Sequence, residues 1–194
     1  MLSAWKPAEP ALSARALEEL YLDIGLEGAL DATVFQKAIM SSQRHGARKG
    51  VLAIADMTRP STEKRLFIID LAARKLLLRT WVAHGRNSGD LYCTDVSNTS
   101  GSLQTSKGMY RVQERIISPK HGAALMLDGL ERGVNDRARD REIIMHGAAY
   151  VSADFIAQHG RLGRSFGCPA VPVEEMSRMI ELLADGGLLY VHAG

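Results

Sequence analysis

The spacing of hydrophobic residues predicts two short helices near the start of the chain. Ser13 and Asp31 are residue types that cap helix N-termini, and each is followed by apolar side chains three and four positions apart. Gly25 is expected to end the first helix. Two short amphipathic helices rarely stand alone in water, so we expect a helical N-terminal segment, residues 1–46, packed on a main domain formed by residues 47–194.

From Gly50 onward the apolar pattern changes to that of β-strands. Short apolar runs bounded by turn residues predict strands at 51–55, 66–70, 76–83, 108–117, 124–127, 143–145 and 188–191. Two further helices are expected, one after His146 and one over 173–183. Because strands and helices do not alternate, we predict an α+β, mainly β fold: a β-sandwich or mixed sheet, largely antiparallel, with peripheral helices.

Composition and charge narrow the possible partners. With 194 residues, 46% of them hydrophobic, the chain is long enough for one core. The net charge of +2 is scattered without a basic run, so we expect no nucleic-acid partner. No apolar stretch is long enough to predict a membrane span, and the first residues lack the features of a signal peptide. The sequence carries no indication of the oligomeric state.

Two residues suggest chemistry. His146 follows a short apolar run, and Cys168 lies on a glycine-flanked turn. A thiol becomes a nucleophile when an imidazole takes its proton, and Gly167 leaves backbone N–H groups uncovered that can stabilise an oxyanion. Cysteine acyl transfer is therefore one hypothesis, and a buried histidine with an unrelated buried cysteine is the other. Cys93 forms no CxxC pair with Cys168 and is interpreted as a buried thiol.

The order of several segments resembles a known family. His146-Gly147 is followed by Ser165-Phe166-Gly167-Cys168-Pro169-Ala170, which is similar to the signature of murein (peptidoglycan) L,D-transpeptidase catalytic domains in the branch with a Ser-x-Gly-Cys-Pro-Ala cysteine motif. That branch also has segments similar to residues 84–89, 120–122, 127–131 and 163–165. The resemblance extends from about Val51 to the C-terminus in the same order, which makes it more specific than one motif.

The resemblance implies a reaction. Such domains cleave the bond between meso-diaminopimelate and the terminal D-alanine of a murein tetrapeptide stem and form 3→3 cross-links. Cys168 would form the thioester, His146 would act as base, and the Gly147 carbonyl would hold the imidazole. The N–H groups of Phe166, Gly167 and Cys168 would form the oxyanion hole. No metal or organic cofactor is implied, the partners would be peptidoglycan stem peptides, and the location would be the periplasm or cell envelope.

Candidate substrate-binding residues come from the same segments. They are His84, Arg86, His121, Arg164 and Ser165. A guanidinium pairs well with substrate carboxylates. The histidines could equally cap loops, and Ser165 could simply stabilise its turn. The better-known branch of the family has His or Arg where this chain has Phe166, so a side-chain role at that position is absent here.

Three alternatives stay open at this point. The same thioester could be hydrolysed, which would make the protein an L,D-carboxypeptidase, or the chain could be a catalytically silent peptidoglycan-binding module. A zinc hydrolase would use His84, His121, His146 and Cys168, which are ligand types but lack the close pairing of metal sites. If His146 accepts the thiol proton, we expect alkylation of Cys168 to be fast near neutral pH and slower in His146→Ala.

Overall fold

The computed structural model describes residues 12–46 and 48–194. Its helices are α1 (Ala14–Ile24), α2 (Ala32–His45), α3 (Ala153–His159) and α4 (Met176–Leu183), the last preceded by a 3₁₀ turn, η1 (Val173–Glu175). Its strands are β1 (Val51–Asp56), β2 (Leu66–Asp70), β3 (Lys75–Thr80), β4 (Gly108–Ser118), β5 (Gly122–Gly129), β6 (Ile144–Gly147), β7 (Ala170–Val171) and β8 (Leu188–His192). Within the described ranges, no helix has both the length and the apolar character needed to cross a membrane.

The first two helices begin where their capping residues predict. Ser13 Oγ accepts a hydrogen bond from the Ala16 N–H at 3.2 Å, and Asp31 Oδ1 accepts one from the Thr33 N–H at 2.8 Å. These bonds satisfy N–H groups that have no partner inside a helix. Gly25 ends α1 in the left-handed conformation, with φ of 75°. Both helix predictions are confirmed.

All eight strands belong to one mixed sheet in the order β3-β2-β1-β8-β4-β5-β6-β7. Most neighbours are antiparallel, whereas β8 runs parallel to β1 and β7 runs parallel to β6. This confirms the α+β, mainly β fold, and of the two predicted arrangements the strands form the mixed sheet. The sequence does not predict β7, because two residues are too few to show a period. The strand predicted over 76–83 ends at Thr80.

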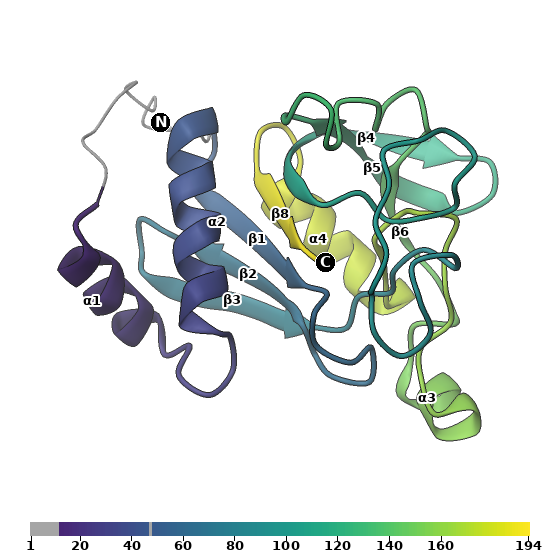
Figure 1. Ribbon diagram of the computed structural model, residues 1–194, viewed down its shortest axis with the longest axis horizontal. Coiled ribbons are helices and arrows are strands. Elements are labelled where there is room, and N and C mark those ends of the chain that lie inside the picture. The colour runs from purple at the N-terminus through teal and green to yellow at the C-terminus, as the bar shows by residue number, and fades with distance from the viewer. Residues whose placement is uncertain (1–11, 47) are drawn as a thin grey trace.

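Helices cover both faces of this sheet (Figure 1). On one face, Phe35 and Ile39 of α2 share an apolar cluster with Leu52 and Ile54 of β1. On the other face, α4 packs on the alternate residues of β1. β1 is therefore buried on both sides, which explains its continuous apolar sequence. The domain boundary between residues 46 and 47 stays a prediction, and α2 shares its core contacts with the sheet.

Candidate active site

The edge formed by β6 and β7 places the predicted nucleophile and the predicted base on neighbouring segments. His146 of β6 lies opposite Ala170 of β7 in parallel register, and Cys168 stands two positions before Ala170. On the other side, Ala83 forms a bridge with Ala170, and Gly85 forms one with Ser165. The segment that carries the thiol, residues 165–170, is called the cysteine loop below. It is held between β6 and residues 83–85.

The His146 imidazole has a defined orientation. Its side chain is 1% exposed, and Nδ1 lies 3.1 Å from the carbonyl oxygen of Gly147. A carbonyl oxygen only accepts hydrogen bonds, so this contact assigns the proton of the neutral ring to Nδ1. Nε2 then carries the lone pair that a general base needs. The contact with the Gly147 carbonyl that the family resemblance implies is present.

A second imidazole lies on the first. His121 stacks on His146 with ring centroids 3.8 Å apart and an angle of 23° between the planes. It comes from the turn between β4 and β5, where Lys120 precedes it. Burial lowers the pKa of His121, and the charge of Lys120 lowers it further. His121, a candidate substrate-binding residue, is therefore in direct contact with the proposed base.

Ser165 closes the cysteine loop on itself. Its hydroxyl donates to the Cys168 carbonyl oxygen at 2.6 Å and accepts from the Gly167 N–H at 3.1 Å. The Gly167 N–H is thus already engaged, which leaves the N–H groups of Phe166 and Cys168 as the remaining candidates for an oxyanion hole. Gly167 has φ of 122°, and a Cβ there would lie 2.8 Å from the Gln104 carbonyl oxygen, so this position requires glycine.

Arg141 fastens the long connection between β3 and β4 beneath the cysteine loop. Its guanidinium donates to the Ser97 carbonyl oxygen at 2.8 Å, to the Gln104 carbonyl oxygen at 2.6 Å, and to the hydroxyls of Ser102 and Ser106. The guanidinium of Arg141 therefore donates its hydrogen bonds to other groups of the same chain. The sequence shows nothing that would distinguish it from the neighbouring arginines, since its partners lie far away along the chain.

The proposed base and nucleophile are both uncharged at rest. Burial raises the pKa of the Cys168 thiol, although the positive charges of Arg141 and Lys120 oppose this shift. Burial also lowers the pKa of His146, and the neighbouring His121 lowers it further. In agreement, Sγ of Cys168 lies 3.8 Å from the Glu142 carbonyl oxygen, an acceptor for a protonated thiol. The thiol proton would then leave during attack on the substrate rather than beforehand.

These pKa directions favour a different pH profile from the fast reaction near neutral pH that the sequence suggests. Alkylation of Cys168 by iodoacetamide should accelerate through the alkaline range, because burial raises the pKa of the thiol. Lys120→Gln should shift the profile to higher pH, whereas Lys75→Gln, on the strand at the opposite edge of the sheet, should not. Mass spectrometry of the Cys168 peptide measures the rate. A plateau already reached at neutral pH would contradict this prediction.

His84 lies inside the fold. Its side chain is 1% exposed, its Nδ1 lies 2.8 Å from the Arg65 guanidinium, and Nε2 lies 3.4 Å from the Gly89 carbonyl oxygen. Burial and the charge of Arg65 lower the pKa of His84 to about 4, so the ring is neutral. The expected contact of His84 with substrate is replaced by a contact with a buried arginine, because the ring points into the core.

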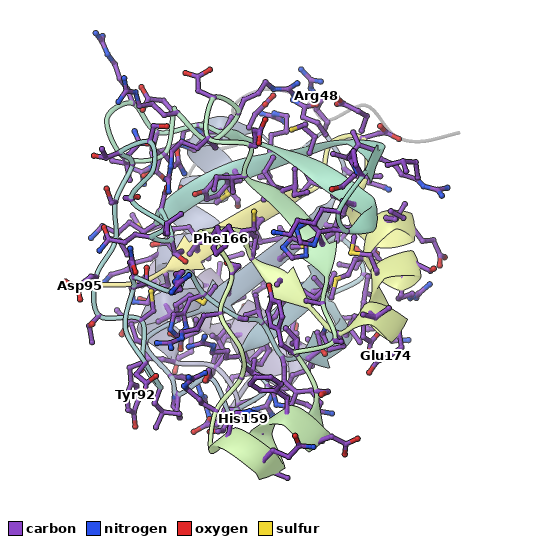
Figure 2. The ribbon with its side chains drawn as sticks, turned by 90° about the vertical axis from the view of Figure 1, so that its right-hand side faces the viewer. Arg48, Tyr92, Asp95, His159, Phe166 and Glu174 are labelled. Atoms are coloured by element: carbon purple, nitrogen blue, oxygen red, sulfur yellow. The ribbon has the colours of Figure 1, made fainter. Side chains whose placement is uncertain are left out.

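Arg86 and Arg164, two of the candidate substrate-binding residues, line one pocket beside the cysteine loop. Phe166 lines the same pocket and is 55% exposed. Figure 2 shows Phe166 near the centre of one face, between Asp95 of the long connection and Glu174 of η1, with His159 of α3 below it. Tyr150 and Arg161 also line the pocket. The sequence gives no sign of Tyr150, whereas the spacing of Arg161 and Arg164 around Gly163 could have suggested a pair.

The described residues contain no group of three or more His, Cys, Asp or Glu side chains placed to hold a metal ion. Of the four side chains considered for zinc, His84 faces Arg65, while His121 and His146 stack on each other. Cys93 and Cys168 are both free thiols, and Cys93 is buried as expected.

Comparison with known proteins gives one family. A sequence model described as the L,D-transpeptidase catalytic domain matches residues 26–192. This range includes α2, all eight strands and every candidate site residue. No curated protein sequence matches the chain.

Three solved structures illustrate what the chain is similar to. An L,D-transpeptidase from Mycobacterium smegmatis has 12% sequence identity and a TM-score of 0.46, over 74% of this chain and 59% of that one. An L,D-transpeptidase from Stackebrandtia nassauensis has 15% identity and a TM-score of 0.43, over 91% and 75% of the two chains. One from Mycobacterium tuberculosis H37Rv has 14% identity and a TM-score of 0.40, over 74% and 57%. The chain therefore spans less than two thirds of the length of both mycobacterial proteins.

Proposed function

The chain belongs to the L,D-transpeptidase catalytic domain family, and from this premise we propose that it is a peptidoglycan L,D-transpeptidase that forms 3→3 cross-links through a thioester on Cys168. The observation that carries the proposal is the parallel pairing of β6 and β7, which sets the cysteine loop beside His146. Its acyl donors would be murein stem peptides, and its location would be the periplasm or cell envelope.

The first half-reaction would begin from the uncharged Cys168 thiol and His146 imidazole. Sγ of Cys168 attacks the diaminopimelate carbonyl carbon while Nε2 of His146 takes the thiol proton. The N–H groups of Phe166 and Cys168 would donate to the oxyanion that forms, with Gly167 as a third donor only if its bond to Ser165 Oγ opens. The carbon–nitrogen bond then breaks, and the imidazolium returns the proton to the departing D-alanine amine. A thioester remains on Cys168.

The second half-reaction reverses these roles. The side-chain amine of another stem attacks the thioester carbonyl, and His146 accepts the amine proton. The carbon–sulfur bond breaks, the proton returns to the sulfur, and an amide links the two stems. Because the Gly147 carbonyl holds Nδ1–H throughout, Nε2 is available at each proton transfer.

Intact-protein and product masses test this proposal together. With a disaccharide tetrapeptide, we expect a mass increase on Cys168 equal to the acyl group, release of D-alanine and a cross-linked dimer. An adduct with only tripeptide as product would identify an L,D-carboxypeptidase, since water would then be the acceptor. Binding of peptidoglycan without any adduct, by folded protein with Cys168 reduced, would instead identify a silent binding module.

A further inference from the structure

The pocket beside the cysteine loop holds more positive charge than the chain neutralises. It has a volume of about 350 Å³ and is lined by three arginines, Arg86, Arg161 and Arg164, together with Tyr150, Phe155, Gly163 and Phe166. Arg161 Nε and Arg164 Nη1 both contact one oxygen, Oδ1 of Asp90, at 2.7 and 3.0 Å. Two of the three guanidiniums share this carboxylate and the third, Arg86, does not contact it, so the group of four side chains has a net charge of +2.

Each of these guanidiniums still has donors to offer. The side chains of Arg161 and Arg164 are 24% and 28% exposed, so their charges are only partly solvated. The Arg86 guanidinium lies 5.9 Å from the Phe166 ring centroid. It forms neither a hydrogen bond nor an ion pair with any residue that the structure describes. Partly desolvated cations with free donors favour an anion that accepts several hydrogen bonds at once.

The pocket is held in place from the interior. Arg164 Nη1 donates to the Gly89 carbonyl oxygen at 3.0 Å, and the same oxygen contacts His84, which in turn contacts the buried Arg65. Elsewhere in the pocket lining, a Cβ on Gly163 would lie 2.4 Å from Tyr150, so glycine allows Tyr150 to pack directly on the backbone. Such support keeps guanidiniums oriented before a ligand arrives.

The pocket adjoins the cysteine loop, which carries the nucleophile. Phe166, one of its walls, stands two positions before Cys168. Tyr150, another wall, packs against Gly163, which stands five positions before Cys168. A ligand group in the pocket would therefore belong to the part of the substrate next to the scissile bond.

We propose that this pocket is a carboxylate subsite that makes the site selective for stem peptides whose carboxylates near the scissile bond are free, over stems in which they are amidated. The inference rests on the proposed function and names its substrate class. A carboxylate accepts hydrogen bonds from two guanidiniums and neutralises one of the two unbalanced positive charges. A carboxamide removes the charge and presents an NH₂ donor to groups that are themselves donors. The apolar walls suit the hydrocarbon part of the same residue.

The test compares the rate of thioester formation on Cys168 for two tetrapeptide stems, one with free carboxylates and one amidated at the glutamate and diaminopimelate carboxylates. Wild-type protein should favour the free stem by about 10-fold or more, the size expected for a charge-assisted hydrogen bond. Arg161→Gln and Arg164→Gln should lose most of this preference, and Arg161→Lys should keep part of it. The matched control is Arg178→Gln, which removes an exposed arginine paired with Glu181 on α4.

The outcomes separate this inference from the proposed function. Equal rates for the two stems in wild-type protein, or an unchanged preference in both glutamine variants, would overturn the subsite while leaving the thioester chemistry in place. No adduct with either stem would reject the proposed function, and the subsite with it. Circular dichroism and the thermal unfolding midpoint of each variant show whether a lost preference comes from the pocket or from unfolding.

Discussion

Cys168→Ala is expected to abolish the thioester adduct and to lower turnover of a tetrapeptide stem by at least about 10³-fold. The proposed reaction passes through a covalent bond to Sγ, and removal of a catalytic nucleophile leaves only the residual acceleration that binding and oxyanion stabilisation supply. Intact-protein mass and chromatography of the products measure both effects. The folded state should survive, because the Cys168 side chain is only partly buried at the edge of the core.

The matched control is the other cysteine. Cys93 is 4% exposed and lies in the long connection, with Sγ 3.9 Å from the Asp95 carbonyl oxygen. Burial raises the pKa of its thiol, so it reacts poorly. Cys93→Ala should therefore keep the adduct and the turnover while losing about 1–2 kcal/mol of unfolding free energy to the cavity. Continued processing of stems by Cys168→Ala would place the nucleophile elsewhere and reject the proposed mechanism.

The second large effect is on stability: Arg65→Met should lower the free energy of unfolding by about 3 kcal/mol or more. Arg65 is fully buried, and its guanidinium donates to the carbonyl oxygens of Val82, Met57 and Arg59 and contacts His84 Nδ1. Burial lowers the pKa of Arg65 to about 10, so the group stays charged at neutral pH. Methionine fills much of the volume but leaves these buried acceptors without donors, at about 1–3 kcal/mol each.

Two opposing terms decide the size of this loss. Removing a buried cation also removes the free-energy cost of its desolvation. For this reason, apolar residues can replace some buried ion pairs without loss of stability. Here the partners are three backbone carbonyl oxygens and the buried His84 ring, which stay buried or partly buried after the substitution, so the orphaned acceptors should dominate. Arg65→Lys is the matched variant: it keeps the charge but cannot donate in the planar fork, and we expect an intermediate loss. Urea unfolding measures all three proteins, and equal midpoints for wild type and Arg65→Met would contradict the prediction.

Local features of the sequence were sufficient to predict most of the helices and strands. The caps at Ser13 and Asp31 and the apolar runs of the strands predict their positions closely, because capping and periodicity depend on residues a few positions apart. β7 is the exception, since two residues show no period. β3 ends before its apolar run does, because the following residues turn toward the cysteine loop, where Ala83 forms a bridge with Ala170.

The candidate site was only partly predictable. His146 and Cys168 could be proposed from residue type and motif, and the contact of His146 with the Gly147 carbonyl depends on adjacent residues. The stacking of His121 on His146 could not be foreseen, because it depends on where the turn between β4 and β5 falls over β6. The same holds for Arg161 and Asp90, which meet only because distant segments fold together.

By itself, the sequence determined the helices, most of the strands, the fold class, the family and the two residues on which the proposed chemistry depends, because each follows from nearby residues or from an ordered set of motifs. Only the tertiary structure decided that His84 faces a buried arginine, that the thiol and imidazole are both neutral at rest, and that three arginines share one pocket. Burial and charge depend on which segments become neighbours, and pKa shifts follow from burial and charge.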